Sequence, residues 1–562
     1  MASSAEARKP RRPFVEFLGV ELAPREGRAL AVTHITAACV LTVAIAMVFR
    51  IPEPTYMAYI VFLVSQNERA ATTTVGVVGQ LAVTLAVLLA LGLMSVDLSE
   101  PALRLSAMAL STFLAMYSLR ILSLGPLTYL AGFVLVMLQS VVDDLPSPEA
   151  LTHLALWLWV VLLVPVVITV LLNLLFGQSV ALLVRRTARK VLQEVEAGLL
   201  GGEVRRHLAR WRELVVSLLP KQPALGRLTD ALIILEALPE TTPVEVREVL
   251  ARRVRACRVA LEGKGTIPAG GGTTMEGGLA AFALTFGAAL TAFRRDFTQS
   301  NTSVPAEHHR RPLLVPDAFT NPAHWQFAFK TTVAVMVVYG IYTLLDWPGM
   351  RTSIVTCFFV ALGSLGETVH KLVLRISGAL IGGLIAGLCI VFVLPHMTDI
   401  GQLCLLIAVV SAGAGWVATS SELLSYAGLQ IAFAFFLGIL QSYGPATDLT
   451  ALRDRVAGIL LGNVVITLVF TLLWPESAIS GLKVALAGAL QAIDTVRRRS
   501  GDAMDARARA AQALVRARHF ELVHRFELSM LPKHSTEDAQ MPRLADVERA
   551  AGEAFVATYD IT

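Results

Sequence analysis

The chain has 562 residues, of which 55% are hydrophobic and 16% are charged, and its mean hydropathy is +0.63. A soluble chain carries about 25% charged residues. The composition therefore excludes a disordered, collagen-like or disulfide-rich secreted protein and argues against a soluble enzyme. Because apolar runs near 20 residues recur, we predict an all-α polytopic membrane protein.

The chain divides by hydropathy into five parts. A polar, basic segment over 1–28 carries no cleavable signal peptide and leads into the first apolar run. We predict a first transmembrane repeat over 29–176, a cytoplasmic helical insert over 177–322, a second repeat over 323–476 and a cytoplasmic helical tail over 477–562. The twelve predicted spans lie near 29–49, 55–66, 75–95, 103–121, 124–142, 153–176, 327–346, 351–366, 372–394, 401–418, 423–442 and 453–474.

The placement of basic residues predicts the orientation. With both termini in the cytoplasm, the outer loops hold five of the 48 Lys and Arg residues, namely Arg50, Arg104, Arg351, Arg453 and Arg455. Basic residues concentrate on the cytoplasmic side of membrane proteins. We therefore predict a multi-pass protein of the bacterial inner membrane with cytoplasmic termini.

The two halves resemble each other. VVIT and LLFGQS in 166–179 match VVIT and LLWPES in 464–477, and LQS at 138–140 matches LQS at 440–442. The offsets are nearly constant, which chance similarity between apolar helices does not explain. Since each half has an even number of spans, the two six-helix repeats are predicted to be parallel, an organisation found in transporters.

The insert has the three-and-four periodicity of amphipathic helices, for example over 183–200 and 243–262. Its glycine-rich stretch, 263–278, lacks the spacing of a phosphate-binding loop, so nucleotide binding is rejected. The net basic charge of the insert suits lipid headgroups or solvent. Basic residues do not alternate with aromatic ones as in a nucleic-acid platform, so no nucleic-acid partner is expected.

Ionisable residues inside predicted spans are candidates for function. Glu367, Lys371 and Arg375 are four residues apart, on one face of a predicted helix, and Lys330 begins another span. Lys330, Lys371 and Arg375 are predicted to bind a substrate anion at the inner mouth. The alternative is a membrane anchor with internal ion pairs.

Two predicted spans are too short to cross the membrane. The segment 56–66 has about 11 residues and covers about 16 Å of a 30 Å hydrocarbon core. Its counterpart, 353–367, is also short. Paired short segments mark transporter sites. Glu68 and Glu367, at their ends, are therefore predicted to couple transport to protons.

One late span, 423–442, combines polar and aromatic side chains. Tyr426, Gln430 and Gln441 offer hydrogen bonds beside several phenylalanines, which suits an aromatic carboxylate. The alternative is that these polar side chains only form hydrogen bonds between neighbouring helices. Asp454 and Arg455 at the start of the next span form either a gate or a helix cap.

Signatures of enzymes are missing from the sequence: it has no H-E-x-x-H, G-x-S-x-G or phosphate loop. We predict that the protein is not an enzyme and needs no cofactor or metal. The five cysteines form no C-x-x-C pair and are predicted to be buried thiols, not disulfides or metal ligands.

Several blocks of the second half resemble the fusaric acid resistance family, also called aromatic acid exporters. The blocks are NPAHWQFAFKTTVAV (321–335), LLDWPGMRTSIVT (344–356), LGSLGETVHKLVLRISGALIGG (362–383), SYAGLQIAFAFFLG (425–438), DRVAGILLGN (454–463) and LLWPES (472–477). The resemblance implies export of aromatic acids such as hydroxybenzoates or fusaric acid. It also implies a periplasmic membrane-fusion partner and an outer-membrane channel. Similarity to plant malate channels implies a homodimer.

Two main hypotheses follow. In the first, the protein is an efflux transporter that exchanges aromatic carboxylates for protons. In the second, it is an anion channel or uniporter, because an inside-negative membrane expels a monoanion without proton coupling. A third possibility is a membrane-anchored scaffold. It is disfavoured, because an anchor needs far fewer spans with polar residues than this chain has.

Overall fold

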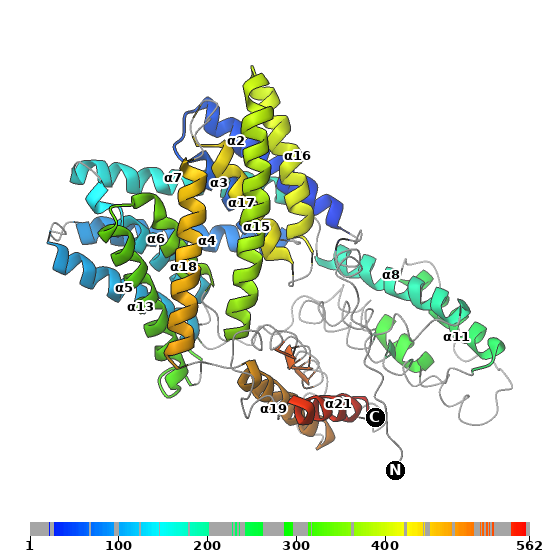
Figure 1. The fold of residues 1–562 in the computed structure, drawn as a ribbon. Helices are drawn as coiled ribbons and strands as arrows, with labels where there is room; N and C mark the ends of the chain where they lie inside the picture. The colour runs from blue at the N-terminus through cyan, green and yellow to red at the C-terminus, as the bar shows by residue number, and fades with distance from the viewer. Residues whose placement is uncertain are drawn as a thin grey trace, which may run out of the picture. The chain divides into compact units, whose positions relative to one another are not determined.

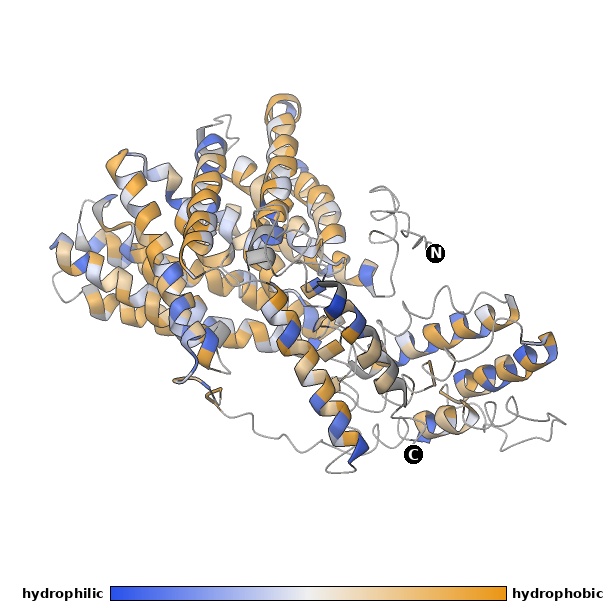
Figure 2. Cartoon of the chain, turned by 60° about the horizontal axis from the view of Figure 1, so that its bottom comes forward, coloured by the Kyte–Doolittle hydropathy of each residue, from blue (hydrophilic) through white to orange (hydrophobic). Residues whose placement is uncertain are grey.

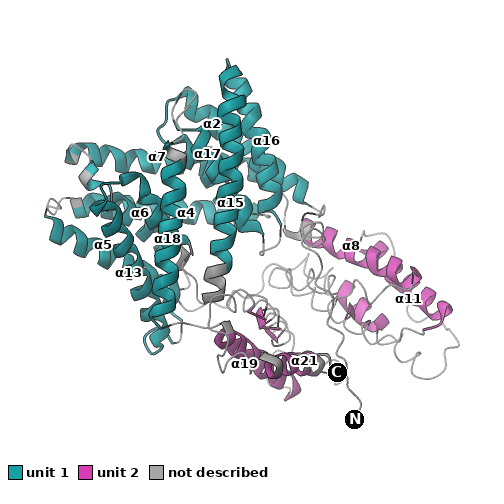
Figure 3. Cartoon of the chain, viewed as in Figure 1, with its two compact units in different colours: residues 1–178, 312–362, 370–474 teal, residues 179–311, 363–369, 475–562 magenta. Residues whose placement is uncertain are grey.

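The computed structural model covers residues 1–562 and divides into two compact units, which are considered separately (Figure 3). Unit 1 comprises 1–178, 312–362 and 370–474, and unit 2 comprises 179–311, 363–369 and 475–562. The structure describes residues 22, 27–66, 69–94, 100–122, 125–144, 147–177, 180–201, 228, 231–232, 235, 242–261, 286–295, 313–315, 317–360, 365–420, 424–441, 443, 450–474, 478–498, 506, 509–510, 513–514, 516–517, 520–521 and 541–557.

Unit 1 is built from helices, and no strand occurs in the described part of the chain (Figure 1). Its first half contains α2 (Arg28–Val48), α3 (Pro54–Val64), α4 (Arg69–Met94), α5 (Pro101–Ile121), α6 (Gly125–Gln139) and α7 (Pro148–Phe176). Its second half contains α13 (Pro322–Leu344), α14 (Thr352–Val360), α15 (Leu365–Phe392), α16 (Ile400–Ala418), α17 (Ser425–Ile439) and α18 (Thr450–Leu472). The predicted all-α class is confirmed.

Local sequence explains where several of these helices begin. Proline occupies the first turn of α3, α5, α7 and α13, where a missing N–H costs nothing. The side chains of Asn321 and Asp399 accept hydrogen bonds from the backbone N–H groups of Ala323 and Gln402, at 3.0 and 2.9 Å. These caps satisfy donors that have no partner inside the helix.

Nine helices of the described residues are long and apolar enough to cross a membrane. Each of the twelve predicted spans coincides with a helix, but α3, α6, α14 and α17 are short, with 11, 15, 9 and 15 residues. The ninth candidate, Ile479–Arg497, lies in the predicted tail. Hydropathy alone does not separate it from a span, although one of its faces packs in the core of unit 2.

The two halves pack against each other reciprocally. The first helix of each half contacts the fourth helix of the other, since α2 packs on α16 and α13 packs on α5. In the same way α3 contacts α17, and α14 contacts α6. Two similar six-helix halves facing each other would produce this pattern.

Glycines bring α15 and α17 together. A Cβ atom at Gly378 would lie 2.7 Å from the carbonyl oxygen of Ala427, and one at Gly382 would lie 2.3 Å from that of Ile431. The backbones therefore approach too closely for any side chain at these positions. Small residues four apart on a helix allow such close packing of two helices.

Three basic side chains bind the carboxyl ends of helices in unit 1. Arg28 donates to the carbonyl of Trp416 at the end of α16, and Arg69 donates to that of Gly177 after α7. Lys330 donates to the carbonyl of Trp474 just after α18, at 3.0 Å. Cations at this end satisfy unpaired carbonyls and the helix dipole.

Unit 2 has a separate core formed by amphipathic helices, which alternate polar and apolar residues where those of unit 1 are largely apolar (Figure 2). Its helices include α8 (Val180–Gly201), α11 (Val244–Ala260), α19 (Ala478–Arg497) and α21 (Met541–Ala557). The predicted helices over 183–200 and 243–262 are confirmed, whereas the 263–278 stretch lies outside the described residues.

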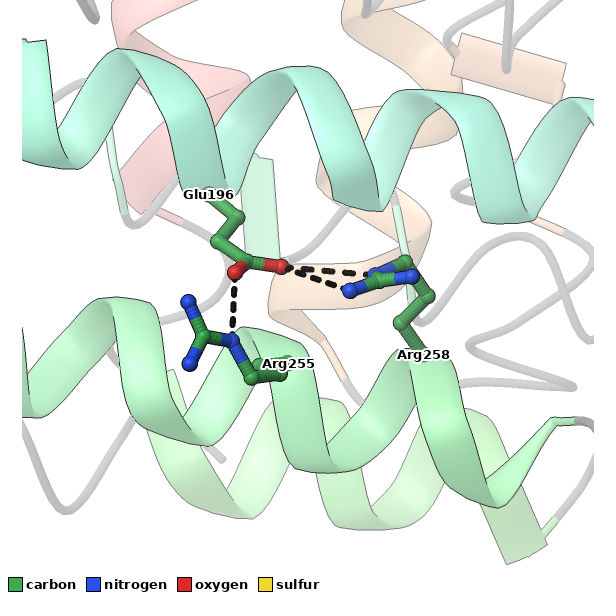
Figure 4. Close-up of polar contacts among 3 residues, drawn as sticks. All are labelled: Glu196, Arg255 and Arg258. Atoms are coloured by element: carbon green, nitrogen blue, oxygen red, sulfur yellow. Dashed lines mark hydrogen bonds and ion pairs between the residues drawn. The ribbon is translucent and has the colours of Figure 1, made fainter. Parts of the chain in front are cut away.

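An ion-pair cluster joins α8 to α11 (Figure 4). The Glu196 carboxylate is 7% exposed and accepts hydrogen bonds from Arg255 Nε at 2.6 Å and from Arg258 Nη2 at 3.2 Å. Because both oxygens have cationic donors, the buried charge is compensated.

Candidate functional site

Arg375 is a buried cation on α15. Its side chain is 1% exposed, and its Nη1 donates to the hydroxyl of Tyr426 on α17 at 2.9 Å. Its Nε and Nη2 have no hydrogen-bond partner among the described residues. A guanidinium remains charged at any physiological pH, so burial without a counter-ion costs several kcal/mol.

Arg455, near the start of α18, has the same character. It is 7% exposed, and its Nη1 donates to the hydroxyl of Thr352 at 3.0 Å. Its guanidinium carbon lies 4.2 Å from the centre of the Phe433 ring, a cation–π contact. Its Nε and Nη2 also lack a partner within the described part of the structure.

One face of α17 connects the two arginines. Tyr426, Gln430 and Phe433 are spaced by four and three residues, so they share a face of the helix. Tyr426 contacts Arg375 at one end of this face, and Phe433 contacts Arg455 at the other. Seven residues along a helix correspond to about 10 Å.

Aromatic rings from the first half cover this face. Tyr59 of α3 stacks on Phe433 with the ring centres 3.9 Å apart, and its hydroxyl lies near both Arg375 and Arg455. Tyr129 of α6 interacts with Arg375 and contacts Phe358 on α14. Both halves of unit 1 therefore contribute to one tract, defined by Arg375, Tyr426, Gln430, Tyr59, Phe433 and Arg455 and called here the arginine–aromatic tract.

The buried charges of unit 1 are all basic within the described residues. The buried Lys and Arg side chains there are Arg28, Arg104, Lys330, Arg375 and Arg455, and no Asp or Glu is buried with them. Two of the five occupy helix ends, as described above. Cations without carboxylates between aromatic rings form an environment that suits an aromatic anion.

The structure brings together four of the predicted substrate-binding residues. Arg375, Tyr426 and Gln430 belong to the tract, and Lys371 extends it, with its Nζ 5.1 Å from the centre of the Tyr426 ring. Gln441 lies beyond the end of α17, where its Nε2 donates to the carbonyl of Gly438 at 3.1 Å. Lys330 of α13 reaches the end of α18 with its Nζ, which donates to the carbonyl of Trp474 and also lies over the Phe470 ring.

The two predicted gate residues have different partners. Asp454 accepts hydrogen bonds from Arg453 at 2.8 and 2.9 Å. Arg455 instead lies in the arginine–aromatic tract. The guanidinium of Arg453 also lies over the Trp347 ring, so Arg453 and Asp454 form a cluster of their own at this end of α18.

The predicted proton-coupling residues cannot be placed. Glu68 lies outside the described residues, and Glu367 is described only as part of helix α15, without its side chain.

Another carboxylate, Glu53, interacts electrostatically with Arg455 from the turn before α3. Desolvation by neighbouring protein atoms raises the pKa of Glu53, although its surface remains exposed, and Arg455 opposes this shift. Its sequence context, an acid between Pro52 and Pro54 before a short helix, is a signal that sequence reasoning missed.

Comparison with known proteins identifies the region that holds most of this tract. Residues 321–469, which run from α13 into α18, match the family model described as fusaric acid resistance protein-like. Over these residues the chain is similar to that family. The predicted family resemblance is confirmed, and the matched region carries Arg375, Tyr426, Gln430 and Arg455.

The similarity to individual proteins extends beyond residues 321–469. The multidrug resistance protein MdtO of Escherichia coli O6:H1 is 27% identical over 517 residues, which cover 86% of this chain and 75% of the relative. The Escherichia coli K12 protein of the same name has the same identity and coverage. MdtO of Shigella flexneri is 39% identical over 195 residues, 34% of this chain and 29% of the relative. No solved structure matches the chain significantly.

The chain is a multi-pass membrane protein similar to multidrug resistance proteins and, over 321–469, to the fusaric acid resistance-like family.

Proposed function

We propose that the protein exports aromatic carboxylic acids across the inner membrane, with the arginine–aromatic tract as the binding site. The supporting observation is the pair of buried arginines, each with two N–H groups unpaired among the described residues and an aromatic ring in contact. A carboxylate offers two oxygens that match the guanidinium fork. An aromatic ring attached to it suits the walls formed by Tyr59 and Phe433.

The anion completes the site electrostatically. Without a bound anion Arg375 is a buried charge without a carboxylate partner among the described residues, which is costly, and Arg455 has only Glu53 nearby. A carboxylate bound first near Arg375 and then near Arg455 moves about 10 Å along α17 without leaving positive surroundings. Lys371 extends the same positive path beyond Tyr426.

The driving force has two candidate explanations. Proton exchange is the first, with Glu68 and Glu367 as predicted carriers and Glu53 as a further carboxylate near Arg455. Voltage-driven movement of the anion is the second. It is favoured by the presence of buried cations and the absence of buried carboxylates in the described part of unit 1. One charge crossing 100 mV contributes about 2.3 kcal/mol.

The wider assembly belongs to the same proposal. Parallel six-helix repeats are supported by the reciprocal packing of α2 on α16 and α13 on α5. Cytoplasmic termini are supported by the scarcity of Lys and Arg on the predicted outer side. Of the five assigned there, Arg104 and Arg455 are buried in α5 and α18. The homodimer, the periplasmic membrane-fusion protein and the outer-membrane channel remain predictions from the family resemblance.

Transport into liposomes by the purified full chain tests the site. Arg375→Gln and Arg455→Gln should each raise the apparent KM for 4-hydroxybenzoate by about 10- to 100-fold, because each removes a charged hydrogen-bond donor. Arg28→Gln is the matched control, since Arg28 is equally buried but binds a helix end. That variant should lose stability and keep its KM. Wild-type KM values in both tract variants would refute the proposed site.

The same liposomes separate the two driving forces. With the membrane voltage held at zero by potassium and valinomycin, a pH gradient should drive uphill movement of the acid if protons are exchanged. Flux that follows voltage and ignores the pH gradient would establish the channel or uniporter mechanism.

A further inference from the structure

Two buried amide side chains lie in the layer of Arg375. Gln430 on α17 is 1% exposed, and Asn463 on α18 is 2% exposed. Both Nδ2 and Oδ1 of Asn463 have no hydrogen-bond partner among the described residues. Nε2 of Gln430 has none by the same geometry, although the Gln430 side chain also hydrogen-bonds with that of Tyr59. Each unpaired buried polar atom destabilises a fold, so such atoms need an explanation.

Helix register places Asn463 at the level of Arg375. Ala379 of α15, Ala434 of α17 and Ile459 of α18 pack in one cluster. Arg375 lies one turn before Ala379, and Asn463 lies one turn after Ile459. Because α15 and α18 run in opposite directions, both steps lead toward the same end of the bundle (Figure 1).

Two further contacts support this register. Gly462, beside Asn463, accepts a weak hydrogen bond from the thiol of Cys357 at 3.9 Å, and Arg375 lies near that thiol. A Cβ atom at Gly378, three residues after Arg375, would lie 2.7 Å from the Cβ of Gln430. The layer therefore combines a cation with unpaired amide donors and an unpaired amide acceptor.

We infer that Asn463 and Gln430 select substrates that carry a hydrogen-bonding ring substituent in addition to the carboxylate. This inference rests on the proposed function. When Arg375 holds the carboxylate, the ring lies in the layer of the two amides. A ring hydroxyl both donates and accepts, so it matches Oδ1 and Nδ2 of Asn463. Unsubstituted benzoate would leave these atoms unpaired, and a buried polar site rejects such an analogue strongly.

Competition binding to the purified full chain tests the inference, with 4-hydroxybenzoate and benzoate as probes. The wild type should prefer 4-hydroxybenzoate by about tenfold or more in Kd, since one unsatisfied buried partner accounts for about that factor. Asn463→Leu and Gln430→Met preserve side-chain volume and remove the amides. Each should bring the ratio close to one, and neither should lower the melting temperature of the ligand-free protein.

Asn173 provides the matched control. It is also a buried asparagine in the last part of a long helix, but its Nδ2 donates to the hydroxyl of Thr72 at 3.0 Å. Asn173→Leu should lower the melting temperature and leave the selectivity ratio unchanged.

The outcomes separate this inference from the proposed function. If Asn463→Leu and Gln430→Met keep the wild-type ratio, the inference is overturned, whatever their melting temperatures. If the wild type binds both acids equally, through Arg375, selection by the amides is also overturned while the export proposal stands. If the wild type binds neither acid, the proposed function fails together with the inference.

Discussion

At the residue scale, the partners of each basic side chain separate structural from functional roles. Arg28 and Lys330 are as deeply buried as Arg375, but they donate to backbone carbonyls at helix ends. Arg375 and Arg455 donate only to neutral hydroxyls and keep unpaired N–H groups among the described residues. Buried polar groups are normally satisfied, so the second pair points to a ligand.

Lys330→Met should destabilise the protein by about 1–2 kcal/mol and leave the apparent KM unchanged, because it removes a cation from the carboxyl end of α18. Thermal melting and liposome transport of the same preparation check this. A raised KM at an unchanged melting temperature would instead support the predicted role of Lys330 in collecting the substrate anion.

Glu53 should make stability depend on pH. Since desolvation raises its pKa, the folded state holds the proton more tightly than the unfolded state. The resulting stabilisation is present below the unfolded pKa of 4.5. It is lost as the pH rises through the folded pKa. Glu53→Gln should therefore match the wild type in acid and exceed it increasingly above pH 4.5. Thermal melts across this range check the trend, and a constant difference would contradict it.

At the element scale, close helix contacts fix the position of the tract. The glycines of α15 let its backbone reach that of α17, and this contact positions Arg375 beside Tyr426. A similar contact occurs between α18 and α14, where a Cβ atom at Gly462 would lie 2.7 Å from the carbonyl oxygen of Ser353. The arginines therefore depend on small residues one or two turns away.

Gly382→Ala should destabilise unit 1 by about 1–3 kcal/mol, because the added Cβ would lie 2.3 Å from the carbonyl oxygen of Ile431 and would push α15 from α17. Gly387→Ala on the same helix is the control, since a Cβ there meets nothing within 4 Å. The control should be neutral or stabilising, because alanine favours helix. Equal melting temperatures for the two variants would show that the close contact does not matter.

At the scale of the whole molecule, the chain has two kinds of core. Unit 1 exposes many large apolar side chains outward, as expected for helices in lipid. Unit 2 buries apolar faces of amphipathic helices and holds its buried Glu196 with two arginines. Because the two cores are separate, we expect a destabilising substitution in one unit to loosen the packing of that unit before the packing of the other.

Cysteine labelling can follow each unit separately. Cys257 is fully buried in the core of unit 2, where burial raises its pKa to about 12, and Cys357 is fully buried in unit 1. Glu196→Gln removes a charged partner of Arg255 and Arg258 and should cost about 1–3 kcal/mol. In variants that keep one cysteine, it should speed maleimide labelling of Cys257 and not of Cys357.

The exposed Glu248 on α11 provides the control for that experiment. Glu248→Gln should leave both labelling rates unchanged, since exposed substitutions rarely alter stability by more than about 0.5 kcal/mol. Faster labelling of both cysteines in Glu196→Gln would show that the two units unfold together.

The sequence by itself determined the class of protein and the positions of its helices, because hydropathy and helical spacing are local properties. The apolar runs predicted every helix of unit 1, and spacing by four placed Lys371 and Arg375 on one face. The blocks that resemble a known family were also readable, since they are patterns in the chain itself. Within 425–439, the mixture of polar and aromatic residues predicted Tyr426 and Gln430 as substrate-binding residues, and in the structure Tyr426 accepts a hydrogen bond from Arg375.

Only the tertiary structure decided which of these residues meet and which are already satisfied. Tyr59 and Arg455 are nearly 400 positions apart in the chain, and the packing of α3 and α18 on α17 brings both to Phe433. Lys330 resembled Arg375 in the sequence until its carbonyl partner at Trp474 was known. Long-range packing and the balance of hydrogen-bond donors and acceptors are properties of the whole fold, so a pattern along the chain does not contain them.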